Sequence, residues 1–281
     1  MSIITFINNR TEETGKTLSL VAIATYMAIE KNNKILIIST TDRESRIKHC
    51  FFDESQTKKN RLAIFGHNNS AIDTESGIDG ISKMIRSKRL KPDIVTNYTK
   101  VVFKDRLEIL LGREEPPIDK KQSDREYIEL IENANKYYDK VFIDIDNNVN
   151  EEVREEIIDK SDLVIVNVSQ NLTSLKKLRE DKKQNYLLNS PKVLILVGRY
   201  DKYSKYNSKN ISRFLGEKKQ VLTMPYNTLY FEATNEAGVP DFFLKLKKVS
   251  DVDDRNVLFI DEVKRATESI IYKLQELQIN M

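Results

Sequence analysis

The chain has 281 residues, of which 40% are hydrophobic and 32% charged, and its formal net charge at pH 7 is +3. This length suffices for one large α/β domain or two small domains, and the small net charge does not by itself indicate a nucleic-acid-binding protein. The single cysteine, Cys50, excludes an internal disulfide framework and fits a reducing cytoplasm, and with only two histidines a zinc site of the usual ligands is not expected. No apolar run approaches the ~18 residues of a membrane span, and the N-terminus lacks the pattern of a signal peptide.

Short, nearly all-apolar segments rich in β-branched residues alternate with helical patterns along the chain. The apolar segments predict strands that are covered on both faces, at residues 3–8, 34–40, 107–112, 140–146, 162–168, 192–198 and 220–226. Apolar residues at helical spacing predict helices at 16–32, 123–139, 172–187 and 253–277. Strand–helix alternation of this kind predicts an α/β fold with a doubly wound, mostly parallel sheet and helices on both faces.

Two further expectations concern the organisation of the chain. In the helix predicted at 123–139, Ser123 is the expected N-cap, with Glu126 at the capping-box spacing. We expect a single domain over residues 1–281, with an insertion or lid within 43–105, where polarity is mixed and basic clusters occur.

The stretch NNRTEETGKT, residues 8–17, separates the first predicted strand from the first predicted helix. It ends in Gly15-Lys16-Thr17, the last three positions of the phosphate-binding pattern G-x-x-x-x-G-K-[ST]. In such a loop, backbone N–H groups and a helix N-terminus face the phosphates, and the lysine reaches their outer oxygens. The first glycine position is Arg10, so the strict pattern is not met, but the strand–loop–helix setting predicts a phosphate-binding loop.

Together with this loop, the order and spacing of several segments resemble the ParA/MinD group of deviant Walker P-loop ATPases. KILIIST (34–40) resembles the second strand, YYDKVFIDIDNN (137–148) the Walker B strand, and SDLVIVNVSQNLTSLKKLRE (161–180) the next strand and helix. VLILVGRYDK (193–202) and MPYNTLYFEATNEAGVPD (224–241) resemble the base-binding region and the segment after it. The resemblance covers nearly the whole chain outside 43–105, and it implies binding of ATP and Mg²⁺ by a protein that forms a homodimer.

The resemblance also assigns roles to individual residues. It places Arg10, Thr11, Gly15, Lys16, Thr17 and Leu18 at the nucleotide. It implies that Thr17 and Asp144 hold Mg²⁺, and that Lys16, Asp42 and Asp144 serve catalysis. Around the adenine it places Arg199, Asp201, Pro225, Tyr226 and Asn227. The alternatives are a helix-capping role for Asp144 and ordinary loop roles for the five residues of the adenine region.

Several residues depart from the family pattern. The signature lysine falls on Thr11, and two loop glycines fall on Glu12 and Glu13. The acidic motif after the second strand falls on Ser39-Thr40-Thr41, with Asp42 one residue late. Atypical members such as the TadZ pilus-localisation proteins show comparable departures. Carboxylates beside phosphate weaken binding, unless Glu12 and Glu13 point outward to solvent or to an Arg or Lys of a partner. Loss of the lysine and the acid predicts weak or absent hydrolysis.

The resemblance implies a cytoplasmic task in spatial organisation: partition of a plasmid or mobile element, or localisation of a surface machine, through an unidentified protein partner. The alternatives are a non-enzymatic scaffold and, less favoured, a metabolic kinase or synthetase of the same superfamily. The basic stretches 83–91 and 176–183 could contact DNA phosphates without sequence preference, or form solvated helix faces. Acidic residues offset the basic ones in the last helix, so we expect it to pack against the domain and not to bind a membrane.

Overall fold

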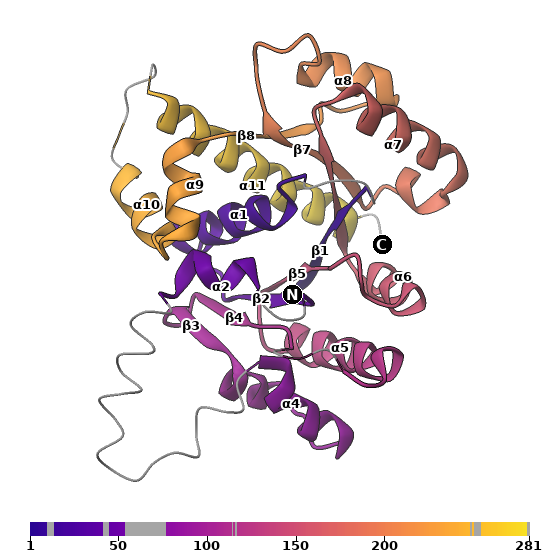
Figure 1. Ribbon diagram of the computed structural model, residues 1–281, viewed down its shortest axis with the longest axis vertical. Helices are drawn as coiled ribbons and strands as arrows, with labels where there is room; N and C mark the ends of the chain where they lie inside the picture. The colour runs from indigo at the N-terminus through magenta and orange to yellow at the C-terminus, as the bar shows by residue number, and fades with distance from the viewer. Residues whose placement is uncertain are drawn as a thin grey trace.

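The computed structural model describes residues 1–9, 14–41, 45–53, 77–113, 115, 117–247, 249 and 254–279. Within these residues one eight-stranded sheet runs in the order β3-β4-β2-β5-β1-β6-β7-β8 (Figure 1). The strands are β1 (Ser2–Asn8), β2 (Ile35–Ser39), β3 (Lys100–Phe103), β4 (Leu107–Leu110), β5 (Lys140–Asp144), β6 (Leu163–Ser169), β7 (Val193–Tyr200) and β8 (Leu222–Pro225). Every pairing is parallel except that of β3 with β4.

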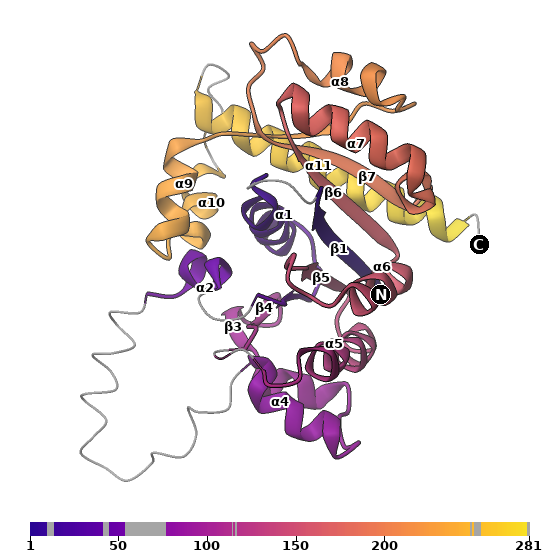
Figure 2. The ribbon, with the colours of Figure 1, turned by 45° about the vertical axis from the view of Figure 1, so that its right-hand side comes forward.

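Helices cover both faces of the sheet (Figures 1 and 2). One face carries α4 (Gly77–Arg86), α5 (Lys120–Asn135), α6 (Glu151–Lys160), α7 (Leu172–Gln184) and α8 (Ser208–Leu215). The other carries α1 (Lys16–Glu30), α2 (Arg46–Phe51), α9 (Thr228–Asn235), α10 (Val239–Leu246) and α11 (Arg255–Ile279). Two short 3₁₀ helices are η1 (Asp93–Tyr98) and η2 (Tyr186–Asn189). The predicted doubly wound, mostly parallel fold is confirmed.

Strand β1 shows why these strands read as continuous apolar runs. Successive side chains of a strand point to opposite faces of the sheet. Ile3 and Ile7 pack into the core beneath α4–α7, whereas Ile4 and Phe6 pack into the core beneath α1 and α11. Because both faces are covered, both sets of side chains are apolar, as expected for a central parallel strand.

All seven predicted strands are present, with ends close to those expected, and four predicted helices correspond to α1, α5, α7 and α11. The capping prediction for α5 is wrong: Asp119 is its N-cap and accepts a hydrogen bond from the backbone N–H of Gln122. Ser123 lies inside the helix, and the Glu126 side chain contacts α4 instead. The sequence analysis missed β3 and the short helices. Of the missed elements, α2, α4, η1 and β3 lie in the region 43–105, which was expected to hold an insertion or lid. That region lies partly outside the described residues, and its role stays a prediction.

Cys50 and α11 both contribute to the core on the α1 face of the sheet. Cys50 is fully buried, and burial raises the pKa of its thiol to about 12, which fits an inert core residue. Helix α11 buries Phe259, Val263 and Ile270 against α1 and β8, as expected for a helix that packs on its own domain. Among the described helices, none combines the length and apolar character that a membrane span requires.

A buried ion pair joins α4 and α5 to the segment after β4. Arg113 Nη2 donates to Glu126 Oε2 at 2.5 Å, and both side chains are buried. Ser82 Oγ donates to the same carboxylate at 2.6 Å, as does Arg86 Nε. Burial alone would raise the pKa of Glu126, but the hydrogen bonds from Ser82, Arg86 and Arg113 outweigh it and hold the pKa below its ordinary value.

Glu126→Gln should lower the free energy of unfolding at pH 7, because Arg113 loses its buried counter-charge; breaking such a pair costs about 3–5 kcal/mol. A depressed folded-state pKa contributes stability that is present above the unfolded-state pKa and lost as pH falls through the folded-state pKa. The variant should therefore lose less stability than wild type between neutral and acidic pH in urea titrations. Glu152→Gln, at an exposed ion pair with Lys121, is the matched control and should change little. An unaltered acid dependence in Glu126→Gln would refute this account of the network.

Candidate functional site

The carboxyl ends of the parallel strands meet at one edge of the sheet, and polar residues gather there. Strand β1 ends at Asn8, its neighbour β5 ends at Asp144, and β2 on the far side of β5 ends at Ser39. Helix α1 begins at the same edge, at Lys16. In open α/β sheets ligands bind at this edge, so it is the candidate site.

Helix α1 begins on a glycine whose backbone shapes the turn into the helix. Gly15 is the N-cap, with φ 76° and ψ 17° in the left-handed region, which residues with a side chain rarely adopt. In the part of the chain that the structure describes, no side chain caps the helix, and its first turn holds no acidic residue. Uncapped N–H groups and the positive end of the helix dipole together favour an anion.

Lys16, Thr17 and Asp144 form a compact cluster at this helix start. Lys16 Nζ lies 2.8 Å from Asp144 Oδ1, and the two side chains are 7% and 2% exposed. Thr17 Oγ1 donates to Asp144 Oδ2 at 2.8 Å, and Lys16 Nζ also donates to the carbonyl of Ile145. The structure thus brings together the three residues that the sequence reading assigned to phosphate and metal.

The alternative role of Asp144, as a cap of the following helix, is wrong. Helix α6 is capped by Asn150, whose side chain accepts from the backbone N–H of Glu152. Asp144 lies instead at the end of β5, where a buried carboxylate is costly unless a cation or hydrogen-bond donors compensate it. Lys16 and Thr17 supply that compensation in the structure.

The donor set at Asp144 fits Mg²⁺ bound together with a phosphate. The hydroxyl of Thr17 and the carboxylate of Asp144 offer the oxygen ligands that Mg²⁺ prefers. Over the described residues, no group of three or more His, Cys, Asp or Glu side chains could hold a metal. A metal at Asp144 would therefore depend on phosphate oxygens and water, which is the usual arrangement for Mg²⁺ in nucleotide sites.

Thr40 links the end of β2 to the end of β5. Its backbone N–H and its Oγ1 both donate to the carbonyl of Asp144 at 3.2 Å, and its Oγ1 accepts from the backbone N–H of Asp146 at 2.8 Å. Thr41 Oγ1 lies 3.5 Å from Asp146 Oδ2. Thr40 therefore positions the Asp144 backbone, a role the sequence reading did not assign. The candidate catalytic residue Asp42 lies outside the described residues, as do Arg10, Thr11, Glu12 and Glu13.

The sequence reading also missed Gly198, which lets β7 approach the loop. A Cβ at Gly198 would lie 2.0 Å from the carbonyl oxygen of Thr14, far closer than any allowed contact. Thr14 Oγ1 in turn donates to Asn8 Oδ1 at 2.5 Å, which anchors this end of the loop to β1. A glycine inside a strand pattern often marks a close backbone approach. The glycine of KVLILVG could therefore have predicted that another segment of backbone lies close to Gly198.

The residues expected around the adenine lie at the ends of two neighbouring strands, at the same sheet edge as the loop. Arg199 is the last but one residue of β7 and Asp201 follows the strand, whereas Pro225 ends β8 and is followed by Tyr226 and Asn227. Asn227 is the N-cap of α9, and its side chain accepts a hydrogen bond from the backbone N–H of Tyr230 at 2.7 Å. Tyr226 is 58% exposed. Their contact with a base stays a prediction.

Leu18 and Asp201, which the resemblance also placed at the nucleotide, form hydrogen bonds within the fold. The carbonyl of Leu18 accepts a hydrogen bond from the hydroxyl of the buried Tyr230 at 2.8 Å, which ties α1 to α9. Asp201 forms a turn, because its Oδ1 accepts from the backbone N–H of Tyr203 at 2.9 Å.

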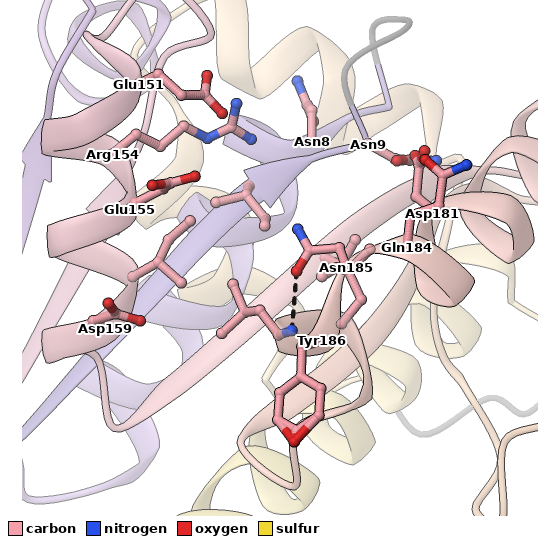
Figure 3. A pocket seen from close by; sticks show the side chains of 15 residues that line it. Asn8, Asn9, Glu151, Arg154, Glu155, Asp159, Asp181, Gln184, Asn185 and Tyr186 are labelled. Atoms are coloured by element: carbon pink, nitrogen blue, oxygen red, sulfur yellow. Dashed lines mark hydrogen bonds between the residues drawn. The ribbon is translucent and has the colours of Figure 1, made fainter.

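A cavity of about 500 Å³ opens between α6 and the α7–η2 segment, at the end of β1 (Figure 3). Four carboxylates line it, from Glu151, Glu155, Asp159 and Asp181, against the single guanidinium of Arg154. An excess of negative charge repels a triphosphate. The start of α1, which offers Lys16 and the N–H groups of the helix N-terminus, is therefore the candidate phosphate site, and this cavity is not.

Comparison with known proteins gives the fold by structure alone. No protein-family model matches the chain, and no curated protein matches it in sequence. A ParA family ATPase from Chlorobium tepidum superposes with a TM-score of 0.67 at 14% identity, covering 97% of this chain and 98% of that one. A plasmid partition protein from Borrelia burgdorferi, bound to AMPPNP, gives 0.59 at 16% identity over 99% and 98% of the two chains. MinD from Pyrococcus horikoshii, complexed with Mg-ADP, gives 0.60 at 15% identity over 97% and 98%. The chain therefore has the ParA/MinD type of P-loop NTPase fold.

Proposed function

We propose that this protein binds ATP and Mg²⁺ at the start of α1 and acts in the cytoplasm in spatial organisation. The task would be partition of a plasmid or mobile element, or localisation of a surface machine, as in an atypical, TadZ-like member of the ParA/MinD group. The observation that carries the proposal is the cluster of Lys16, Thr17 and Asp144 at an uncapped helix N-terminus. Two proteins of the same fold, complexed with AMPPNP and with Mg-ADP, support it.

In this proposal the three side chains exchange partners when nucleotide binds. Lys16 leaves Asp144 and donates to phosphate oxygens, while the N–H groups of α1 face the same phosphates. Thr17 and Asp144 would hold Mg²⁺, directly or through water, where it would supply positive charge to offset that of the phosphates. Thr40 keeps the Asp144 backbone in place through the two hydrogen bonds that it donates to the Asp144 carbonyl.

Asp144→Asn should remove the Mg²⁺ dependence of nucleotide binding, because the amide keeps the size of the side chain but loses its charge. Partners that support a bound metal typically contribute about 10–100-fold in affinity, and we expect a loss in that range. Calorimetry with ATP in Mg²⁺ and in EDTA measures it, and binding in EDTA should change little. Asp146→Asn, a half-buried neighbour that contacts Thr41, is the control. If Mg²⁺ increased the ATP affinity of wild type and of Asp144→Asn by the same factor, Asp144 would not be a metal ligand.

The proposal includes a nucleotide-dependent homodimer with slow or absent hydrolysis. Nucleotide would select the dimeric state, which then recruits a protein partner. Thr11 stands where the resemblance expects the lysine that reaches across the dimer, and Arg10 is the nearest cation in sequence. Glu12 and Glu13 add like charges that oppose a close approach of two subunits unless cations face them.

Sedimentation velocity should show a dimer with a non-hydrolysable ATP analogue and Mg²⁺, and a monomer with ADP. The dimer should weaken in Arg10→Ala and at high salt, since salt screens exposed pairs, and phosphate release should be very slow. If Arg10→Ala dimerised as fully as wild type, Arg10 would not be the cation that stabilises the dimer. Robust turnover that disappears in Asp42→Ala would show that Asp42 supplies the missing acid, contrary to this account.

A second candidate is a non-enzymatic scaffold that keeps the fold as a docking module. One observation favours it: the Lys16 ammonium is already satisfied by Asp144 and the Ile145 carbonyl, so the fold needs no ligand to compensate this buried charge.

Contact with DNA phosphates through residues 83–91 is less well supported, because Arg86 in that stretch already binds the Glu126 carboxylate.

A further inference from the structure

Asn167 of β6 carries a buried amide that the structure leaves unpaired. Its side chain is fully buried, and neither its amide nitrogen nor its amide oxygen has a hydrogen-bond partner among the described residues. Buried polar side chains nearly always find a partner, and leaving one unpaired destabilises the fold. An unpaired amide at this place therefore calls for an explanation.

The position of Asn167 in the sheet places its side chain on the face that carries α1. On β6, Leu163 and Ile165 pack into the core beneath α1, whereas Val166 and Val168 pack into the opposite core. Side chains alternate along a strand, so Asn167 faces the α1 side. β6 lies directly beside β1 in the sheet (Figure 2).

The residues beside Asn167 on the two neighbouring strands indicate which group could form a hydrogen bond with its amide. On one side its register partner is Leu196 of β7, which is apolar. On the other side its partner is Asn8 of β1, which is on the same face and accepts the hydrogen bond from Thr14 Oγ1. The polar side chain beside Asn167 in register is thus Asn8, which holds Thr14 at the end of the loop.

We propose that Asn167 is a positioning residue for the start of α1, and that its amide pairs with the backbone of Thr14 or Gly15 when nucleotide is bound. This inference rests on the proposed function. The empty protein bears the cost of the unpaired amide, and binding of nucleotide removes that cost. Asn167 thereby favours the loop conformation that holds phosphate, at the expense of stability in the empty protein.

The test uses Asn167→Leu, which replaces the amide by an apolar side chain of similar shape. Without nucleotide, the variant should unfold at a higher temperature than wild type, because it no longer buries an unpaired amide. Its affinity for an ATP analogue with Mg²⁺ should be about tenfold weaker, the change expected for one lost hydrogen bond to the loop. Hydrogen exchange at Thr14 and Gly15 should slow less on binding than in wild type.

Thr25→Val is the matched control, since the Thr25 hydroxyl is also buried and unpaired but lies within α1, away from the loop. It should raise the unfolding temperature without changing nucleotide affinity. If Asn167→Leu does not fold, Asn167→Ala carries the same comparison of affinity and loop protection. Unchanged affinity and loop protection in these variants, with wild type binding normally, would overturn the inference and leave the proposed function standing. A wild type that binds no nucleotide would overturn both.

Discussion

Lys16→Ala is expected to abolish detectable ATP–Mg²⁺ binding. Lys16 is held at the start of α1, next to uncapped helix N–H groups, where its ammonium can reach phosphate oxygens. A hydrogen bond to a charged group contributes about 1.5–3 kcal/mol, so each bond that this lysine makes to phosphate corresponds to about tenfold to a hundredfold in affinity. Calorimetry on wild type and variant measures the loss.

The control for this change is Lys31→Ala. Lys31 is exposed at the other end of α1, so the variant removes the same charge far from the loop and should bind as wild type does. Thermal unfolding of Lys16→Ala shows whether the fold persists when Asp144 loses its ion pair with Lys16 and keeps the hydrogen bond from Thr17. Equal affinity of folded Lys16→Ala and wild type would contradict a phosphate-binding loop at this site.

Gly198→Ala is expected to cause a comparable loss of nucleotide binding from outside the loop. The new Cβ would lie 2.0 Å from the Thr14 carbonyl oxygen, a backbone atom that can move only if the loop moves. Thr14 immediately precedes the Gly15 turn, so its displacement shifts the phosphate-facing N–H groups of α1. Misplacement by about 1 Å can cost a hundredfold in a positioned site. Calorimetry and thermal unfolding separate loss of binding from loss of fold.

Gly238→Ala is the matched control for Gly198→Ala. A Cβ at Gly238 would lie 3.5 Å from the Cα of Ala233, which is ordinary van der Waals contact, and its φ of −96° suits any residue. The control should keep wild-type affinity. Should Gly198→Ala bind nucleotide as tightly as Gly238→Ala, the close approach of β7 would have no role in shaping the loop.

The sequence predicted those parts of the fold that depend on local pattern. Buried parallel strands are apolar on both faces, so runs such as IITFIN and KVFIDID were recognisable without knowledge of their neighbours. The pairing of Lys16 and Thr17 with Asp144 was also predictable, because carboxyl ends of adjacent parallel strands meet at one edge.

The parts that the sequence did not predict depend on contacts between distant segments. Glu126 has the capping-box spacing from Ser123, but the helix already begins at Lys120, and the Glu126 carboxylate pairs with the buried Arg113. Short elements such as β3 and α8–α10 span too few residues to show a reliable period. The roles of Gly198 and Asn167 follow from what lies opposite them in space, which a strand pattern does not reveal.

A crystal structure of the wild-type protein with AMPPNP and Mg²⁺ would test the central claim most directly. The account predicts phosphates against the N-terminus of α1, with Lys16 moved from Asp144 to a phosphate oxygen and Mg²⁺ beside Thr17 and Asp144. Nucleotide bound elsewhere, or a retained Lys16–Asp144 pair with no nucleotide at saturating concentration, would contradict it.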